Sequence, residues 1–254
     1  MKQLLKRALN GMGFDLVRYY PPSVADFRSM GDLTEEQRKT ISTAKPFTGT
    51  SIERMTALVN AVTYVSQNHI PGDIAECGVW RGGSMMTVAL TLMALGDKTR
   101  ELYLYDTFEG MSAPTEHDKS RDGVSADEQL KNEPKGTGVW CYAGLDDVRA
   151  NILSTGYPEE KVHLVKGKVE DTIPATLPSL LSLLRLDTDW YESTKHELTH
   201  LYPLLTANGV LIIDDYGHWE GARKAVDEYF QSRGQPVYLH RIDYTGRSLV
   251  KNGS

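Results

Sequence analysis

Residues 73–83 read DIAECGVWRGG, a short apolar run followed by glycines at positions 78, 82 and 83. Residues 73–77 have the length and composition of a buried strand, and residues 84–95 (SMMTVALTLMAL) predict a helix with a broad apolar face. Glycine permits positive φ angles and close approach of a ligand to the backbone, and the first turn of a helix offers free N–H groups to a carboxylate. The turn is therefore either a loop that binds the carboxylate of a cofactor or an ordinary strand-to-helix connection.

Two common nucleotide-binding sequences are absent from this turn. Its G-x-x-x-G-G spacing lacks the G-x-G of dinucleotide-binding turns, and no G-K-[ST] follows as in a P-loop. A nucleoside remains compatible with the sequence, because the next apolar run ends in ELYLYD and places Asp106 where an acid would receive the two hydroxyls of a ribose. An acid at the end of a strand is also a common helix N-cap, so Asp106 has two interpretations.

Short apolar runs alternate with longer amphipathic segments along the rest of the chain. We expect further strands at residues 101–105, 162–165, 210–213, 237–242 and 247–251, and further helices at residues 145–153, 194–205 and 221–231. The apolar run that ends residues 177–186 fits a buried strand, although periodicity alone leaves a helix open. Residues 110–138 are polar and without a period, which predicts a loop or mobile lid. This order predicts a single doubly wound, mostly parallel α/β sheet whose ligands bind at the carboxyl ends of the strands.

Composition excludes several classes of protein. The chain has 254 residues, of which 40% are hydrophobic and 24% charged, as in ordinary globular domains. A net charge of −6 argues against a broad nucleic-acid surface, and no segment approaches the roughly 18 to 20 apolar residues of a membrane-spanning helix. The first residues, MKQLLKRALNGMGF, lack the apolar region of a secretory signal, and two cysteines, Cys77 and Cys141, are too few for a disulfide framework. We therefore expect a cytoplasmic protein.

Acids gather after two of the expected strands. Residues 186–191 read LDTDWY and residues 211–216 read LIIDDY, and one strand–helix–strand unit separates them. Neighbouring parallel strands end at the same edge, so Asp187, Asp189, Asp214 and Asp215 should converge on one pocket. Four like charges repel one another unless a cation binds or a pKa shifts, and an all-oxygen ligand set favours Mg²⁺. The alternative is that these acids cap helices or lie solvated on the surface.

Several long blocks of sequence resemble one known family. ECGVWRGGSMM, YDTFEGMSAPTEHD, GKVEDTIP, LRLDTDWYEST and IIDDYGHW, spread from Thr48 to Tyr229, are similar to the macrocin O-methyltransferase (TylF or MycF-like) family. The resemblance implies a class I methyltransferase (Rossmann-like) fold over residues 46–254, preceded by a helical N-terminal extension, residues 1–45. It also implies Mg²⁺-dependent transfer of a methyl group from S-adenosylmethionine to a sugar hydroxyl of a small-molecule glycoside or nucleotide-sugar.

The resemblance also implies roles for individual residues. The cofactor would be bound by Thr50, Ser51, Arg54, Glu76, Gly78, Arg81, Gly82, Gly83, Asp106, Thr107, Phe108, Lys168 and Val169. The metal would be held by Asp187, Asp214 and Asp215, and Asp189 would be the general base. Residues 1–45 resemble the family least, and they would contact the acceptor or a neighbouring subunit, since homo-oligomers are common for such enzymes.

Other residues near the acids have two interpretations each. Trp190, Tyr191 and Glu192 follow the expected base and either contact the substrate or pack in the protein, as do His218 and Trp219. We expect the acids of residues 110–138, Glu116, Asp118 and Asp122, to be solvated.

Two hypotheses compete with methyl transfer. A Mg²⁺-dependent phosphohydrolase could use the same Asp cluster, but its D-x-D would follow the first strand of the sheet, whereas DTD here follows a late one. A catalytically silent cofactor-binding protein would be expected to lack some of the four carboxylates, and all four are present. In the methyl-transfer hypothesis, Mg²⁺ chelated by vicinal hydroxyls stabilises alkoxide charge while Asp189 accepts the proton.

Overall fold

The structure is a computed structural model that describes residues 6–7, 9, 11–13, 31–134, 138–234 and 236–253. The chain divides into two compact units, residues 1–33 and residues 34–254. Much of the first unit lies outside the described residues, so the predicted extension over residues 1–45 is described only in part, and its boundary at residue 45 stays a prediction.

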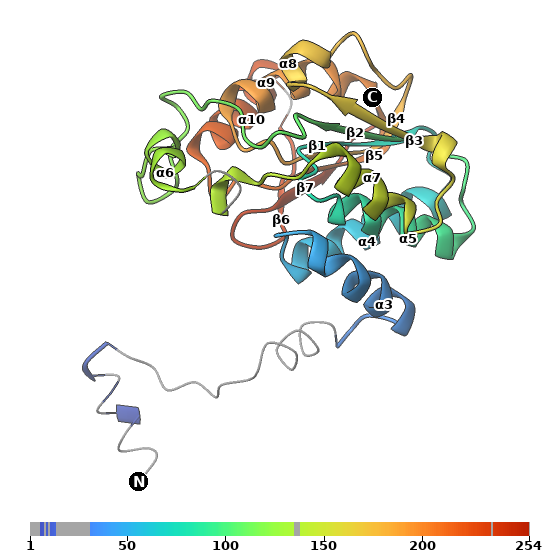
Figure 1. Cartoon of the computed structure of the whole chain (residues 1–254), viewed down its shortest axis with the longest axis horizontal. Coiled ribbons are helices and arrows are strands. Elements are labelled where there is room, and N and C mark those ends of the chain that lie inside the picture. Colours follow the sequence, from blue (N-terminus) through green and yellow to red (C-terminus); the bar gives the residue numbers. More distant parts are fainter. Residues whose placement is uncertain are drawn as a thin grey trace. The chain divides into compact units, whose positions relative to one another are not determined.

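Seven strands form one sheet in the order β3-β2-β1-β4-β5-β7-β6 (Figure 1). The first five are parallel, β7 pairs antiparallel with β5, and β6 pairs antiparallel with β7. This arrangement confirms the predicted single, mostly parallel sheet. The strands are β1 (Asp73–Cys77), β2 (Leu102–Asp106), β3 (Val162–Lys166), β4 (Leu181–Leu186), β5 (Leu205–Ile213), β6 (His240–Arg241) and β7 (Arg247–Val250).

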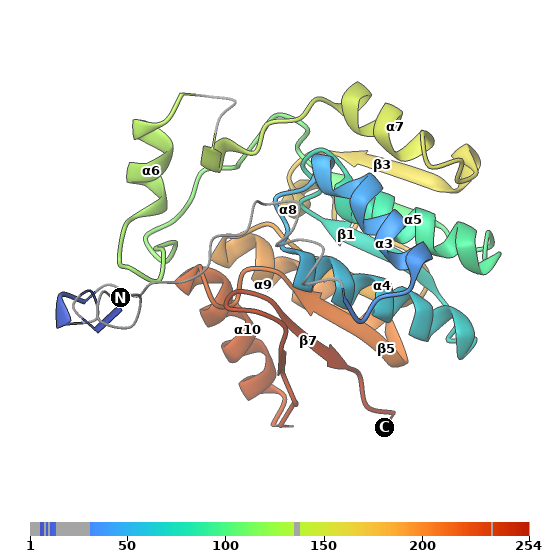
Figure 2. The ribbon, with the colours of Figure 1, turned by 90° about the horizontal axis from the view of Figure 1, so that it is seen from below.

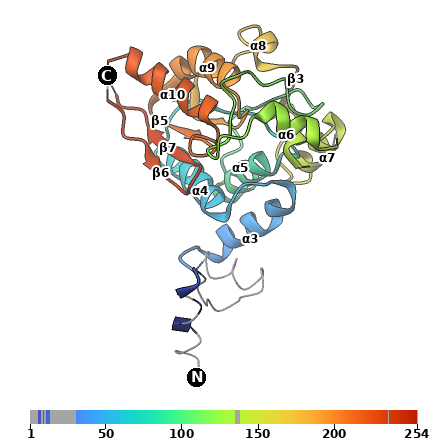
Figure 3. The same ribbon diagram turned by 90° about the vertical axis from the view of Figure 1, so that its left-hand side faces the viewer.

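Helices cover both faces of the sheet, as Figures 2 and 3 show. On one face, α5 packs against three other helices; this group comprises α3 (Glu35–Ala44), α4 (Ile52–Gln67), α5 (Gly83–Leu95) and α7 (Leu145–Leu153). The other face carries α8 (Val169–Thr172), α9 (Tyr191–His200) and α10 (Glu220–Ser232). Leu198, Val226 and Phe230 of that second group are buried against Leu184 and Leu211 of the central strands. Burial on both faces explains why the strands read as continuous apolar runs.

The register of the central strands aligns the residues that follow them. Glu76 of β1 pairs with Arg185 of β4, which in turn pairs with Ile212 of β5. The backbones approach closely at this edge: Gly78 has φ +78°, and a Cβ on it would overlap the backbone oxygen of Asp187. Only glycine fits there, so the close approach of the two backbones explains why position 78 is a glycine.

Two predicted elements differ from the structure near the middle of the chain. Residues 110–138 were expected to be without regular structure, but they contain α6 (Ala126–Asn132) and lead into a 3-10 turn, η2 (Gly138–Trp140). Only Ala126 and Leu130 of α6 are buried, which is too few for a recognisable period. The expected helix over residues 194–205 instead spans 191–200 and is followed by a 3-10 turn, η4 (Tyr202–Leu204), that contains Pro203.

Differences also occur at the later strands. The strand expected at residues 210–213 begins earlier in the structure, because β5 starts at Leu205 and includes Asn208 and Gly209; three extra residues between Leu205 and Val210 shift the pairing with β4. Asn208 takes φ +64° within this irregularity. The strand expected at residues 237–242 is limited to His240–Arg241. Further 3-10 turns are η1 (Lys45–Phe47) and η3 (Glu159–Lys161).

Candidate active site

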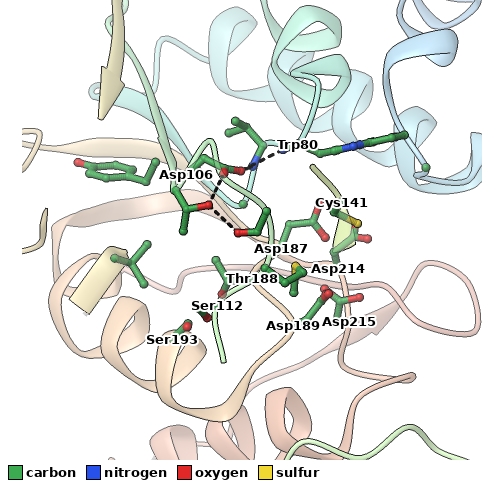
Figure 4. Close-up of a pocket in the computed structure, with 18 of the residues that line it drawn as sticks. Trp80, Asp106, Ser112, Cys141, Asp187, Thr188, Asp189, Ser193, Asp214 and Asp215 are labelled. Atoms are coloured by element: carbon green, nitrogen blue, oxygen red, sulfur yellow. Dashed lines mark hydrogen bonds between the residues drawn. The ribbon is translucent and has the colours of Figure 1, made fainter. Parts of the chain in front are cut away.

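A cavity of about 390 Å³ opens at the carboxyl ends of the parallel strands. It brings together most of the charged residues predicted for the site (Figure 4). The predicted residues that line it are Thr50, Arg54, Gly78, Asp106, Thr107, Lys168, Val169, Asp187, Asp189, Asp214 and Asp215. The structure therefore places the glycine turn and the two pairs of acids around one space, as the strand-end argument requires.

The other residues predicted to bind the cofactor do not line this cavity. Ser51 caps α4 by accepting the N–H of Arg54, and its hydroxyl donates to Asp243. Arg81 forms an ion pair with Asp147 (3.0 Å), and 37% of the Arg81 side chain is exposed. The remaining residues are buried or belong to the turn backbone, and they are Glu76, Gly82, Gly83 and Phe108. Their roles toward a cofactor stay predictions.

Asp106 clamps the glycine turn. One carboxylate oxygen accepts the backbone N–H groups of Val79 (2.8 Å) and Trp80 (3.1 Å) (Figure 4), and the other accepts the N–H of Phe108 (2.7 Å). Burial raises the pKa of Asp106, and these backbone hydrogen bonds oppose that shift. The second strand thus fixes the shape of the turn after the first one, which sequence reasoning did not anticipate.

The acids after β4 and β5 form a compact cluster. Single carboxylate oxygens of Asp187, Asp214 and Asp215 all lie within 4.8 Å of one another. Oδ2 of Asp215 is buried without a hydrogen-bond partner, so a bound cation or a hydrogen-bond donor would satisfy this oxygen. Three hard oxygen donors with an unsatisfied oxygen among them fit a Mg²⁺ ion. This arrangement supports the convergence that the two D-rich segments predicted.

Burial raises the pKa values of Asp187, Asp189 and Asp215. It is the largest cause of the raised pKa values of Asp187 and Asp215, and neighbouring carboxylates add to the shift. The pKa of Asp189 is raised to about 7, again chiefly by burial and then by the charges of Asp187 and Asp214, while a hydrogen bond with Asp215 opposes the rise. Asp189 has φ +69°, an uncommon backbone conformation for a residue with a side chain. The segment after β4 is therefore held in a specific shape beside the other acids.

Arg185 is the most important residue that sequence reasoning missed. Its side chain is 2% exposed, and Nη1 donates to Oε1 of Glu76 and to Oδ2 of Asp187 (2.6 Å). Nη2 donates to the hydroxyl of Thr50 (2.9 Å) and to Oδ1 of Asp214. A signal was available, because an arginine inside the apolar run LLSLLRL is expected to be buried only if it is paired.

A second guanidinium reaches the same acids from α4. Nη1 of Arg54 donates to Oδ2 of Asp214, and Nε lies 3.1 Å from Oδ2 of Asp243. Gly246 packs against the side chain of Arg54, since a Cβ at Gly246 would approach its Cδ to 2.9 Å. The resemblance assigned Arg54 to the cofactor; the structure places it beside the acid cluster, where it supplies positive charge.

Trp190, Tyr191 and Glu192 do not line the cavity. Trp190 is 2% exposed and packs edge to face against Trp219 at a ring-centroid distance of 5.0 Å. Glu192 is exposed on the first turn of α9. Substrate contact by these three residues stays a prediction. Other residues that line the cavity are Met111, Ser112, Cys141, His218 and Trp219.

Asp118 was expected to be a solvated acid, and this prediction is wrong. The residue is fully buried, and its carboxylate accepts hydrogen bonds from two segments. The sequence around Asp118 does not indicate this burial, because one hydrogen-bond partner, the backbone N–H of Tyr191, is 73 residues away.

The sheet order and the position of the cavity define a class of fold. A parallel sheet that ends in an antiparallel pair, with the cavity at the carboxyl ends of its strands, is the fold of the class I S-adenosylmethionine-dependent methyltransferases. The solved structure of the O-methyltransferase NovP matches with a TM-score of 0.70 at 30% identity, and the match covers 80% of this chain and 81% of that chain. Among the described residues, no helix is both long and apolar enough to cross a membrane.

Sequence comparison identifies the family. The model of the macrocin O-methyltransferase (TylF) family matches residues 20–250. The 8-demethyl-8-(2,3-dimethoxy-alpha-L-rhamnosyl)-tetracenomycin-C 4'-O-methyltransferase of Streptomyces olivaceus is 35% identical over 77% of this chain and 72% of its own length. The mycinamicin III 3''-O-methyltransferase of Micromonospora griseorubida is 31% identical over 77% of this chain and 74% of its own length. The chain belongs to the macrocin O-methyltransferase family and is an O-methyltransferase.

Proposed function

We propose that this enzyme transfers a methyl group from S-adenosylmethionine to a sugar hydroxyl of a glycoside or nucleotide-sugar, and that the reaction requires Mg²⁺. The observation that carries the proposal is the convergence of four aspartates on the cavity that the glycine turn also lines. The name of the Streptomyces olivaceus relative, which specifies 4'-O-methylation of a rhamnosyl tetracenomycin, supports a sugar as the acceptor.

The two ends of the cavity suit the two substrates. We assign the cofactor to the part of the cavity lined by Gly78, Asp106, Thr107, Lys168 and Val169, where the Asp106 carboxylate holds the glycine turn in shape through the N–H groups of Val79 and Trp80. The acceptor is assigned to the end with the four aspartates. Its walls, Met111 and Trp219 among them, offer apolar surface against the carbon face of a sugar ring.

Asp187, Asp214 and Asp215 would hold the metal, since their oxygens are the hard donors that Mg²⁺ prefers. When bound, S-adenosylmethionine supplies the methyl group and Mg²⁺ supplies positive charge beside the attacking oxygen. Arg185 forms ion pairs with two of these three carboxylates, those of Asp187 and Asp214, and neutralises part of their charge.

Asp189 is the proposed general base, because it lines the cavity beside the metal-binding acids and has no ion pair among the described residues. The acceptor hydroxyl gives its proton to the Asp189 carboxylate while its oxygen forms a bond to the methyl carbon. The cofactor would leave as a neutral thioether that keeps the electron pair of the broken carbon–sulfur bond.

The proposal is tested with purified full-length protein and S-adenosylmethionine labelled in the methyl group. Acceptors are aryl rhamnosides, free rhamnose and a nucleoside-diphosphate rhamnose, each with Mg²⁺ and with EDTA, and cofactor binding is measured separately by calorimetry. We expect label to enter a sugar only when Mg²⁺ is present. Failure to bind S-adenosylmethionine would refute the proposal, and hydrolysis of p-nitrophenyl phosphate without methyl transfer would restore the phosphohydrolase hypothesis.

A further inference from the structure

Asp118 joins the segment between β2 and α7 to the start of α9. Oδ2 accepts hydrogen bonds from the backbone N–H (2.6 Å) and the hydroxyl (2.9 Å) of Thr115, and Oδ1 accepts the backbone N–H of Tyr191 (2.8 Å). The fit around this carboxylate is tight, because a Cβ on Gly221, at the start of α10, would overlap Oδ1. Asp118 therefore lies against the beginnings of both helices that follow the aspartate pairs.

The same segment is bonded along the connection between Asp215 and α10. The backbone N–H of Arg121 donates to the carbonyl of His218 (2.7 Å), and the N–H of Glu220 donates to the carbonyl of Lys119 (2.9 Å). Ser120 forms an isolated antiparallel bridge with Trp219. These bonds are main-chain pairs, so they fix the path of the backbone independently of side-chain rotamers.

A side-chain contact adds a further link beside the proposed base. Nε1 of Trp190 donates to the carbonyl of Ser112 (3.0 Å), and Ser112 lines the cavity together with Met111. Trp190 and Trp219 also bury Ala126 and Leu130 of α6. Figure 2 shows α6 standing out from the sheet at the end of this segment. Trp190 and Tyr191, which each make one of the links to the segment, directly follow Asp189.

We propose that residues 110–134 form a fixed wall of the acceptor-binding half of the cavity, and that Asp118 is a positioning residue that holds this wall in register with Asp189. The inference rests on the proposed function, because it assumes that the acceptor occupies the aspartate end of the cavity. The wall places Met111 and Ser112 at a set position relative to the base, so the acceptor hydroxyl meets the Asp189 carboxylate in one orientation.

The primary test is Asp118→Asn, which keeps the size of the side chain. An amide offers one acceptor oxygen, so it cannot accept from both Tyr191 and Thr115 without turning an N–H₂ group toward a donor. We expect KM for the acceptor to rise about tenfold, the scale of losing one hydrogen bond to a charged group. The calorimetric affinity for S-adenosylmethionine should stay unchanged. Asp122→Asn, in the same segment but with 73% of its side chain exposed, is the control.

Hydrogen exchange gives a readout that needs no acceptor. In Asp118→Asn, the amides of residues 111–126 and of the first turn of α9 should exchange faster than in the wild type or in Asp122→Asn. A variant with a lower melting temperature and unchanged acceptor KM would reduce Asp118 to a structural role and overturn the inference. If the wild type itself shows no methyl transfer, the proposed function fails, whereas the exchange result still reports on the wall.

Trp190→Phe provides an independent variant if Asp118→Asn does not fold. Phenylalanine retains most of the packing against Trp219 but removes the N–H that reaches the carbonyl of Ser112. We expect the same pattern, a raised acceptor KM with unchanged cofactor affinity. Equal acceptor KM values in Trp190→Phe and the wild type would contradict the proposed coupling between the wall and the base.

Discussion

Nη1 of Arg185 lies 2.6 Å from Oδ2 of Asp187, two residues further along the same chain segment. The pair is unusual because the cation is 2% exposed while it also bonds Glu76 and Asp214. Removing the guanidinium would leave three carboxylates close together with little solvent, and an uncompensated buried charge is strongly destabilising. Arg185 is therefore central both to the stability of this edge of the sheet and to the geometry of the acid cluster.

Arg185→Leu should lower the free energy of unfolding by about 3–5 kcal/mol, the usual cost of breaking a buried ion pair from one side. Arg81→Leu is the matched control, because the Arg81–Asp147 pair has side chains that are 37% and 41% exposed. That control should cost about 1 kcal/mol or less. Urea denaturation followed by circular dichroism measures both values. Similar losses for the two variants would show that the buried ion pairs of Arg185 stabilise the fold no more than the exposed Arg81–Asp147 pair does.

Asp189→Asn should reduce kcat by about 10²–10⁴-fold, because the amide cannot accept the hydroxyl proton. Cofactor affinity should not change, since Asp189 lines the part of the cavity that we assign to the acceptor. Steady-state kinetics with labelled cofactor and calorimetry measure the two quantities. Asp122→Asn, with 73% of its side chain exposed, serves as the control, and full activity of Asp189→Asn across the pH range would rule out Asp189 as the base.

Asp187→Asn and Asp215→Asn should each weaken metal binding by at least about tenfold, since each removes a charged oxygen donor from the cluster. Titration of the purified protein with Mn²⁺, followed by electron paramagnetic resonance, measures this without any turnover. Asp227→Asn is the control, because Asp227 accepts the hydroxyl of Tyr216 and is not part of the cluster. Equal affinity in the cluster variants and the control would place the ion elsewhere.

Gly78→Ala should lower the free energy of unfolding by more than about 3 kcal/mol, since it combines a strained φ with overlap against the backbone of Asp187. Gly96 separates these two effects, because it also has a positive φ of +73° but nothing within 4 Å of an added Cβ. Gly96→Ala should cost only about 1–2 kcal/mol. Thermal and chemical denaturation measure the loss of stability in both variants. Equal losses would mean that the backbones at Gly78 and Asp187 can move apart.

Where apolar runs end in acids, the sequence predicted which side chains line the cavity. Asp187 and Asp214 were predicted to meet because neighbouring parallel strands end at one edge, and that argument needs only strand assignment and topology. Their convergence is confirmed by the cluster that they form with Asp215. Gly78 was identified as a special position, although its structural reason, the backbone of Asp187, could be seen only with the strands paired.

The residues that were missed depend on partners far away in the chain. Asp118 resembled other loop acids because its bond to the backbone of Tyr191 has no sequence signal. The short helix α6 buries two side chains against Trp190 and Trp219, so its stability comes from packing rather than from its own pattern. Arg185 could have been suspected from its apolar surroundings, but the identity of its partners required the register between β1, β4 and β5.

Two internal guanidiniums, Arg54 and Arg185, give the acid cluster its own counter-ions. We therefore expect this part of the chain to reach its final shape during folding before any divalent ion arrives. The ion would then be a ligand of a finished protein rather than a component of its architecture. Chelators should stop turnover while leaving the melting temperature almost unchanged, and the preference among divalent ions would be free to diverge between relatives without putting the fold at risk.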